Sequence, residues 1–297
     1  MSRTSIFSPS VVHPHRARGA RRALAAMLAA IATTAVAHGQ TKSDSPPPPD
    51  GSKKLPIVAP KPPPALPATG GAPVVTEVPG APEPRVLWDK FIDACGGKDS
   101  MRGGGSRRTK GTILVPAVGM KGSIETFAKA PNRMLVKTTM GDFGTMEQCF
   151  DGTNAWAIDA MSGPRLLEGQ ELESFKRDAL YEGPFGYLDQ ARSAKTLGKA
   201  TFADKECWVV ELKETVGGDL TCYLDASEGF LRGMRMIADT QMGPMPVEMQ
   251  VVEYGTFGST RIPSKLLTRV MMQEFTSTTD EVTWEEIPDA TFEPPPP

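Results

Sequence analysis

The stretch Met245-Pro-Val-Glu-Met-Gln-Val251 places an apolar side chain at every second position. Side chains of a β-strand point alternately to opposite faces of a sheet, so this period of two predicts a strand with one apolar face. The same alternation recurs in 208–212, 220–224 and 266–272. Each of these strands is therefore expected to be half-buried in an antiparallel sheet.

Turn residues divide the chain after residue 108 into short runs, which we predict to be strands. The runs are 109–115, 122–128, 133–140, 144–150, 155–159, 195–202, 207–213, 220–224, 231–237, 245–254, 264–272 and 275–285. Apolar residues spaced three or four apart predict helices at 86–95, which Gly96-Gly97 terminates, and at 166–180. The expected fold is mainly β (α+β): a half-open antiparallel β-barrel of about a dozen strands, with helices covering the concave face.

Composition divides the chain into four segments. Residues 1–39 contain five arginines without an acid and then an alanine-rich apolar run, which indicates a signal peptide cleaved near Ala37 or Gly39. A permanent membrane anchor is the alternative, but a span needs roughly 20 apolar residues. Fourteen of the 28 prolines lie within 46–84, so 40–85 is a Pro-rich linker, either a semi-extended spacer or disordered. Residues 86–293 form the folded domain, and 294–297 are a proline tail.

Charged and nucleophilic residues exclude several classes of function. All three histidines, at positions 13, 15 and 38, precede the folded domain, which excludes catalytic triads, Cys-His dyads and most zinc sites there. Removing the leader leaves 28 basic and 35 acidic side chains, a net charge of −7, which disfavours nucleic-acid binding. The basic run 102–108 is interpreted as a flexible, solvated loop. Glutamates at 168, 171, 173, 281, 285 and 286 could supply a catalytic pair, but a solvated surface is the better interpretation. No catalytic residue, metal site or cofactor is predicted, and the protein is predicted not to be an enzyme.

The four cysteines, Cys95, Cys149, Cys207 and Cys222, allow three disulfide pairings. A hairpin turn at Gly217-Gly218 would place Cys222 opposite about Lys213, roughly 20 Å along the strand from Cys207. That separation exceeds the reach of a disulfide. Buried free thiols are the default expectation.

A series of short motifs follows one order along the chain. They are the helix ending at Gly96-Gly97, Lys110-Gly-Thr-Ile113, Phe127-Ala-Lys-Ala-Pro-Asn-Arg133, Phe150-Asp-Gly-Thr-Asn-Ala-Trp156, the insert near Gly169-Gln-Glu171, Tyr223-Leu-Asp-Ala-Ser-Glu-Gly-Phe-Leu231, Glu253-Tyr-Gly255, Ile262-Pro-Ser-Lys265 and Ile287-Pro-Asp-Ala-Thr-Phe292. In this order they resemble the outer-membrane lipoprotein-sorting family, relatives of the periplasmic lipoprotein carrier. The resemblance covers essentially residues 86–293 and implies a LolA-like fold, an unclosed antiparallel barrel whose members hold acyl chains or lipoproteins in the hollow. None of the carrier's own functional residues is matched, so no residue role is transferred.

Methionine is unusually concentrated, with twelve of the 15 between Met120 and Met272. A flexible thioether adapts to variable acyl chains, but it also fills an irregular core, and the sequence leaves both interpretations open. If the first holds, the apolar hollow is lined by Met134, Val136, Met146, Trp156, Leu220, Leu224, Met234, Met236, Met245, Met249, Val270 and Met272.

The sequence therefore predicts an exported, periplasmic binding protein of the cell envelope that holds a lipid acyl chain or a lipoprotein without covalent chemistry. Contact with a membrane is expected to be transient at most. The alternative is a periplasmic sensor or adaptor that binds an envelope protein partner through the same fold.

Overall fold

The structure is a computed structural model that describes residues 72–101, 105–159, 163–240, 243–271 and 273–294. The predicted signal peptide with its cleavage site, most of the predicted linker, Met272 and nearly all of the proline tail lie outside these residues. None of the helices in the described ranges has the length and apolar character needed to span a membrane.

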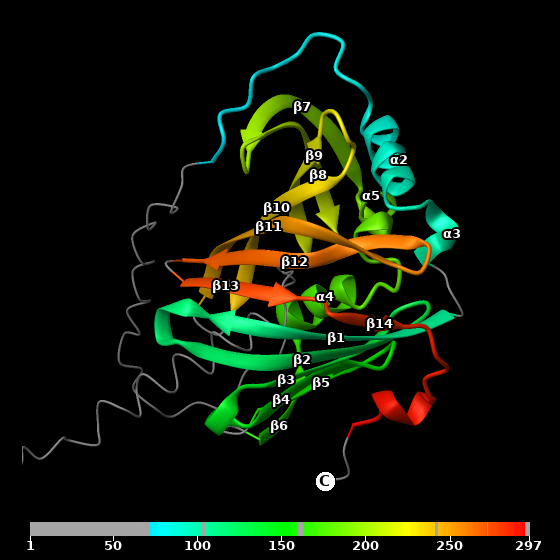
Figure 1. The fold of residues 1–297 in the computed structure, drawn as a ribbon, viewed down its shortest axis with the longest axis vertical. Coiled ribbons are helices and arrows are strands. Elements are labelled where there is room, and N and C mark those ends of the chain that lie inside the picture. The colour runs from blue at the N-terminus through cyan, green and yellow to red at the C-terminus, as the bar shows by residue number, and fades with distance from the viewer. Residues whose placement is uncertain (1–71, 102–104, 160–162, 241–242, 272, 295–297) are drawn as a thin grey trace, which may run out of the picture.

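Fourteen strands in these ranges form one antiparallel sheet, which curves without closing into a barrel (Figure 1). Its order is β6-β5-β4-β3-β2-β1-β13-β12-β11-β10-β9-β8-β7, with β14 also pairing with β1. The strands are β1 (Ser106–Val115), β2 (Met120–Lys129), β3 (Arg133–Thr139), β4 (Thr145–Phe150), β5 (Ala155–Asp159), β6 (Gly163–Leu167), β7 (Ser193–Phe202), β8 (Lys205–Thr215), β9 (Gly218–Asp225), β10 (Leu231–Thr240), β11 (Gly243–Phe257), β12 (Thr260–Val270), β13 (Gln273–Thr278) and β14 (Glu281–Thr283). The pairing of β1 with β13, in which Ile113 faces Ser277, joins the two halves of the sheet.

Short helices cover the concave face and the ends of the sheet. They are α2 (Pro84–Ala94), α3 (Lys98–Met101), α4 (Gly169–Asp178) and α5 (Tyr187–Gln190), with 3₁₀ turns η2 (Pro116–Val118), η3 (Gly141–Phe143), η4 (Gly183–Gly186) and η5 (Asp289–Phe292). Figure 1 shows α4 between the two halves of the sheet and α2 beside β7. Helix α2 starts at a proline, and Gly96 and Gly97 follow it with φ of +106° and +86°. Because glycine adopts positive φ without a Cβ penalty, the predicted stop at this pair is confirmed.

The main core lies between the concave face and these helices. Leu87, Trp88 and Phe91 of α2 pack against Phe185 from the segment after α4 and against the apolar sides of the strands. Trp88 is fully buried, and its Nε1 donates a hydrogen bond to the carbonyl oxygen of Phe185 at 3.2 Å. The polar atom of the largest core side chain is thereby satisfied, and α2 is tied to the insert.

The predicted mainly β fold with an open sheet is confirmed, but several predicted boundaries are wrong. Leu166 and Leu167 belong to β6, so the second helix begins only at Gly169. The predicted strand 275–285 is two strands, because the backbone changes partner: the N–H of Thr279 donates to Ser264 of β12, and that of Asp280 to Lys110 of β1. The predicted loop 102–108 ends earlier, since β1 starts at Ser106.

The last part of the predicted linker packs on the sheet. Thr76 exchanges two backbone hydrogen bonds with Lys199 of β7, at 2.8 and 2.9 Å. The Thr196 hydroxyl donates to the carbonyl oxygen of Pro82, and Val75 packs against an apolar cluster on the convex face. This segment pairs with the edge of β7, which would otherwise be an open edge.

The end of the described chain covers the convex face of β3–β5. The carbonyl oxygen of Phe292 accepts hydrogen bonds from Cys149 Sγ and Trp156 Nε1, at 3.3 and 3.4 Å. Lys129 donates to Asp289 at 2.6 Å. Buried Ile287 and Phe292 complete a small core here, so the Ile-Pro-Asp-x-x-Phe motif covers an apolar patch of the sheet.

We predict that Gly111→Ala destabilises the junction between the two halves. A Cβ at Gly111 would lie 1.7 Å from the carbonyl oxygen of Thr278, so β1 and β13 must separate locally. The expected loss is about 2–3 kcal/mol in the free energy of unfolding, measured by urea denaturation. Gly186→Ala is the matched control, because its Cβ would meet nothing closer than 3.9 Å. Equal stability of the two variants would contradict this packing.

We predict a pH-dependent role for Asp225 in the turn between β9 and β10. Burial alone would raise its pKa, but hydrogen bonds from the Glu228 and Ser227 backbone, the Ser227 hydroxyl and Arg232 outweigh it and hold the pKa below its usual value. The ionised carboxylate therefore stabilises the fold above about pH 4, and this contribution is lost as the pH falls towards the folded-state pKa. Asp225→Asn should cost about 2 kcal/mol at pH 7 and less at pH 3. Asp142→Asn, at an exposed position, is the control, and a loss independent of pH would contradict the assignment.

Candidate functional site

Most of the predicted hollow residues meet on the concave face of the sheet. Eight of the twelve belong to the main core: Met146, Leu220, Leu224, Met234, Met236, Met245, Met249 and Val270. Each is 8% exposed or less. The alternation that identified them puts their side chains together, and the covering helices exclude solvent from this face.

The other four predicted residues are not part of the main core, although Met134 and Val136 lie on the same concave face, under α4. Val136 and Met134 pack in a second cluster with Phe150 and with Phe175 of α4. Trp156 lies on the convex face with Cys149, because it pairs with Cys149 across β4 and β5, and so it does not line the concave face. Met272 lies outside the described residues.

Residues 168–191, here called the insert, occupy the concave side. Phe175 of α4 is fully buried, and Phe185, Tyr187 and Leu188 pack into the main core. The sequence predicted that helices cover the concave face, and the insert lies there as expected. Its side chains stand where an apolar ligand would have to lie.

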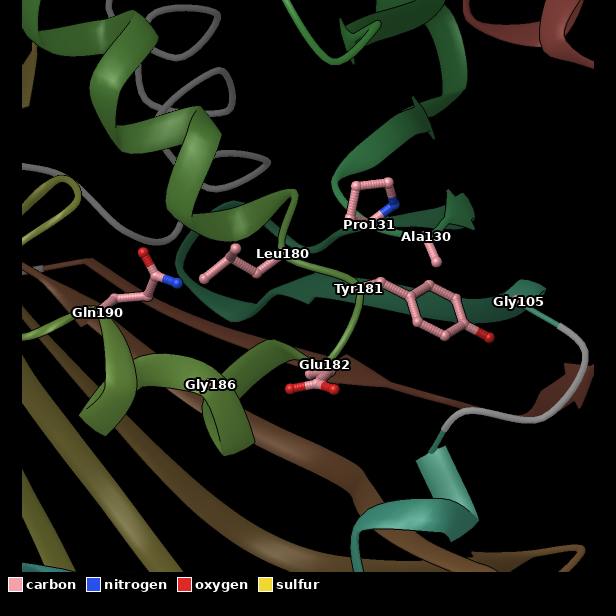
Figure 2. Close-up of a pocket in the computed structure, with 8 residues that line it drawn as sticks. All are labelled: Gly105, Ala130, Pro131, Leu180, Tyr181, Glu182, Gly186 and Gln190. Atoms are coloured by element: carbon pink, nitrogen blue, oxygen red, sulfur yellow. The ribbon is translucent and has the colours of Figure 1, made fainter.

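A cavity of about 440 Å³ opens at the rim of the concave side (Figure 2). Its lining comes from the insert and from the ends of β1 and β2: Gly105, Ala130, Pro131, Leu180, Tyr181, Glu182, Gly186 and Gln190. This volume lies within the range of roughly 300–1,000 Å³ typical of small-molecule sites. None of the twelve predicted residues lines this cavity, because it is bounded by loops and glycines that carry no alternating pattern.

The cavity wall is held in place by contacts across the rim. The backbone N–H of Tyr181 donates to the Pro131 carbonyl oxygen at 3.0 Å. Arg107 Nη1 donates to the Tyr181 carbonyl oxygen at 2.7 Å, and its guanidinium carbon lies 4.5 Å from the centre of the Tyr181 ring. Burial lowers the pKa of Arg107, while its contact with Tyr181 opposes that effect. These contacts fix the middle of the insert against β1 and the β2–β3 turn.

A charged pair is buried at the C-terminal end of α4. Arg177 is 0% exposed, and its Nη1 donates to the carbonyl oxygen of Gly217 in the β8–β9 turn at 3.0 Å. Its Nε lies 3.9 Å from Asp178 Oδ1, too far for a hydrogen bond. Burial raises the pKa of Asp178 well above its usual value, and the charge of Arg177 offsets only part of that effect. A cation in an apolar core is costly unless it is well paired.

All four cysteines are buried free thiols, in agreement with the default expectation. The predicted register is wrong. The hairpin turns at Val216-Gly217, with Thr215 opposite Gly218, and a bulge between Leu212 and Thr215 shifts the pairing by one more residue, so Cys222 lies opposite Val210 rather than near Lys213. Cys207 pairs with Asp225 and packs on the convex face, whereas Cys222 packs on the concave face. The two sulfur atoms therefore point to opposite sides of the sheet.

The concave face is a predominantly apolar surface. Among the described residues, no group of three or more His, Cys, Asp or Glu side chains is placed to hold a metal ion. The concave face offers thioethers, aliphatic groups and aromatic rings, with one buried guanidinium. Such a surface binds apolar chains by burial and dispersion.

No protein-family model matches the chain, and no curated protein matches its sequence. Its fold is LolA-like: a LolA superfamily protein from Nitrosomonas europaea aligns with a TM-score of 0.51 at 12% identity, covering 72% of this chain and 99% of that one. A DUF1329 family protein from Desulfovibrio piger gives 0.49 at 9% identity, with 70% and 96% covered. A domain assigned to outer-membrane lipoprotein sorting, from Vibrio parahaemolyticus, gives 0.42 at 10% identity, with 66% and 92% covered.

We predict that none of the four thiols reacts in the native protein. Burial raises the pKa of each to about 12, so the reactive thiolate is scarce at pH 8 and reagent access is blocked. Titration with Ellman's reagent should give no reaction within an hour in buffer and four thiols in guanidinium chloride. Modification of any thiol in buffer at the rate of free cysteine would show that its cover opens readily.

Proposed function

We propose that this protein is an exported, periplasmic binding protein that holds the acyl chain of a lipid or lipoprotein against the concave face of its open sheet. The observation that carries the proposal is that face itself, on which six methionines and many aliphatic side chains are buried beneath a short helical insert. The LolA-like fold supports the proposal, and the arginine-rich leader with its apolar run supports export.

Binding requires that the ligand replace the side chains of the insert. An acyl chain that enters at the rim cavity would displace Leu180 and Phe185 from the concave face and take over their contacts. The exchange of one apolar surface for another costs little, while each CH₂ removed from water contributes about 0.8 kcal/mol. Methionines can repack around chains of different length because the thioether is flexible. The eight predicted lining residues that belong to the main core are the proposed contacts of the chain.

The same mechanism explains release without covalent chemistry. The insert and the ligand compete for one apolar surface, so a better acceptor removes the chain and the insert returns to its place. Contact with a membrane would then be transient, limited to loading and unloading. The acidic mature chain, with a net charge of −7, fits a role without nucleic acid.

The test is a substitution whose side chain fills the rim cavity. Gly186 lines it, and a Cβ there would meet only Glu182 atoms, at 3.9 Å and beyond. Gly186→Leu should therefore place an apolar side chain in the cavity and weaken the binding of a fluorescent C16 fatty acid at least tenfold. Gly186→Ala is the matched control, since it changes the backbone preference equally but adds one methyl group, and it should change the affinity less than about twofold.

Thermal unfolding and circular dichroism of both variants would show that they are folded. If Gly186→Leu binds the fatty acid as tightly as the wild-type protein, the acyl chain does not enter through the rim cavity. Failure of the wild-type protein to bind any acyl probe, together with a ligand-free mass in native mass spectrometry, would contradict the carrier and favour the adaptor that binds an envelope protein.

A further inference from the structure

The Arg177 guanidinium has fewer partners than its burial demands. It carries five N–H donors, yet Nη1 bonds only Gly217, Nη2 reaches the sulfur of Met236 at 3.7 Å, and Nε has no hydrogen-bond partner. A residue that served only to pack the insert would be better apolar, because desolvating a charge is costly. The surplus donors therefore indicate a partner that is absent from the fold itself.

Asp178, next to Arg177 in the chain, also lacks a hydrogen-bond partner at one side-chain atom. Its Oδ2 is buried without a hydrogen-bond partner, and its side chain is 10% exposed. Burial raises the pKa of Asp178 and also that of the nearby Tyr187, which favours the protonated carboxyl group, the form that can donate a hydrogen bond. Two neighbouring groups, one a guanidinium and one an acid, thus each offer an unused donor.

Two donors with one positive charge complement a head group that carries at least two oxygen atoms and a negative charge. A carboxylate or phosphate oxygen accepts from Arg177 Nε, and a second oxygen accepts from the Asp178 hydroxyl. The pair stands among the apolar residues of the concave face, so its anion must be attached to an apolar chain that fits there.

We propose that Arg177 and Asp178 form a head-group site for a single-chain anionic lipid whose acyl chain lies along the concave face. This inference rests on the proposed function, since the chain must enter the same hollow. The route passes through the rim cavity, because Leu180, only two residues after Asp178, lines it. The hydrogen bond from Arg177 Nη1 to the Gly217 carbonyl oxygen holds the guanidinium in place. Glycine allows this close approach, because a Cβ at position 217 would lie 3.3 Å from Arg177 Cζ.

The test compares head groups on one chain in the wild-type protein. Palmitate and hexadecyl phosphate should bind at least about tenfold more tightly than methyl palmitate or hexadecanol in calorimetry, because only the anions satisfy both donors with charge-assisted bonds. Inorganic phosphate in millimolar excess should not displace palmitate, because it lacks the chain.

Arg177→Met supplies the matched variant, with an unbranched side chain of similar length and no charge. It should bind palmitate and methyl palmitate equally, at the wild-type affinity for the ester. Asp178→Asn keeps a donor at this position and should retain the preference for palmitate. The wild-type comparison stands even if Arg177→Met does not fold.

Four outcomes would overturn the head-group site. Equal affinity of wild type for palmitate and its methyl ester would leave the acyl carrier intact but remove the anion site. If folded Arg177→Met still prefers palmitate to methyl palmitate, the preference must come from other residues. Displacement of palmitate by inorganic phosphate would indicate a site for the free anion. If neither palmitate nor the ester binds, the proposed function fails as well.

Discussion

The structure depends on how an open sheet buries its concave face. The sheet curves far enough to form a concave hollow, but its two end strands, β6 and β7, do not pair with each other. Backbone hydrogen bonds therefore cannot seal the hollow, and side chains from α2 and the insert must do so. The indole of Trp88 links these two covers through Phe185. This one face holds most of the buried apolar residues in the described part of the chain, and the loops, edges and termini are arranged around it.

The cover is not uniform in strength. Helix α2 is amphipathic, begins at a proline and ends at two glycines, so it is an ordinary surface helix with a well-defined buried side. The insert is made of short helical pieces that carry a buried charge, an adjacent acid and a cavity at their rim. Unsatisfied polar groups lower the cost of opening, because leaving the core lets water solvate them. Opening of the insert is therefore expected to be easier than opening of α2, which is why the proposed ligand enters beside the insert.

Period-two patterning in the sequence predicted the sheet, its open form and eight residues that share the concave core. It could not place Trp156, because alternation identifies a face within a strand but not which side of the sheet is concave. The missing strands, β6 and β14, are three to five residues long and lie beside a proline or a change of partner, where no alternation develops. The predicted register of this hairpin was wrong because the turn lies one residue earlier than the glycine pair suggests, and because the bulge after Leu212 leaves little trace in composition. The rim cavity and the Arg177–Asp178 pair depend on tertiary packing of the insert, which no local pattern encodes.

The pairing of Ile113 with Ser277 has a kinetic consequence. These residues stand far apart in the chain, and the entropy of closing so long a loop must be lost before the contact forms. Proteins dominated by such distant pairings fold slowly. Until β13 has been made and docked, β1 keeps an unpaired edge, and the sheet exists as two separate fragments. If the protein is exported, as proposed above, this delay is useful, because an unfinished sheet can still pass through a narrow translocation channel. The contact that joins the two halves would thus also keep the newly made chain transportable.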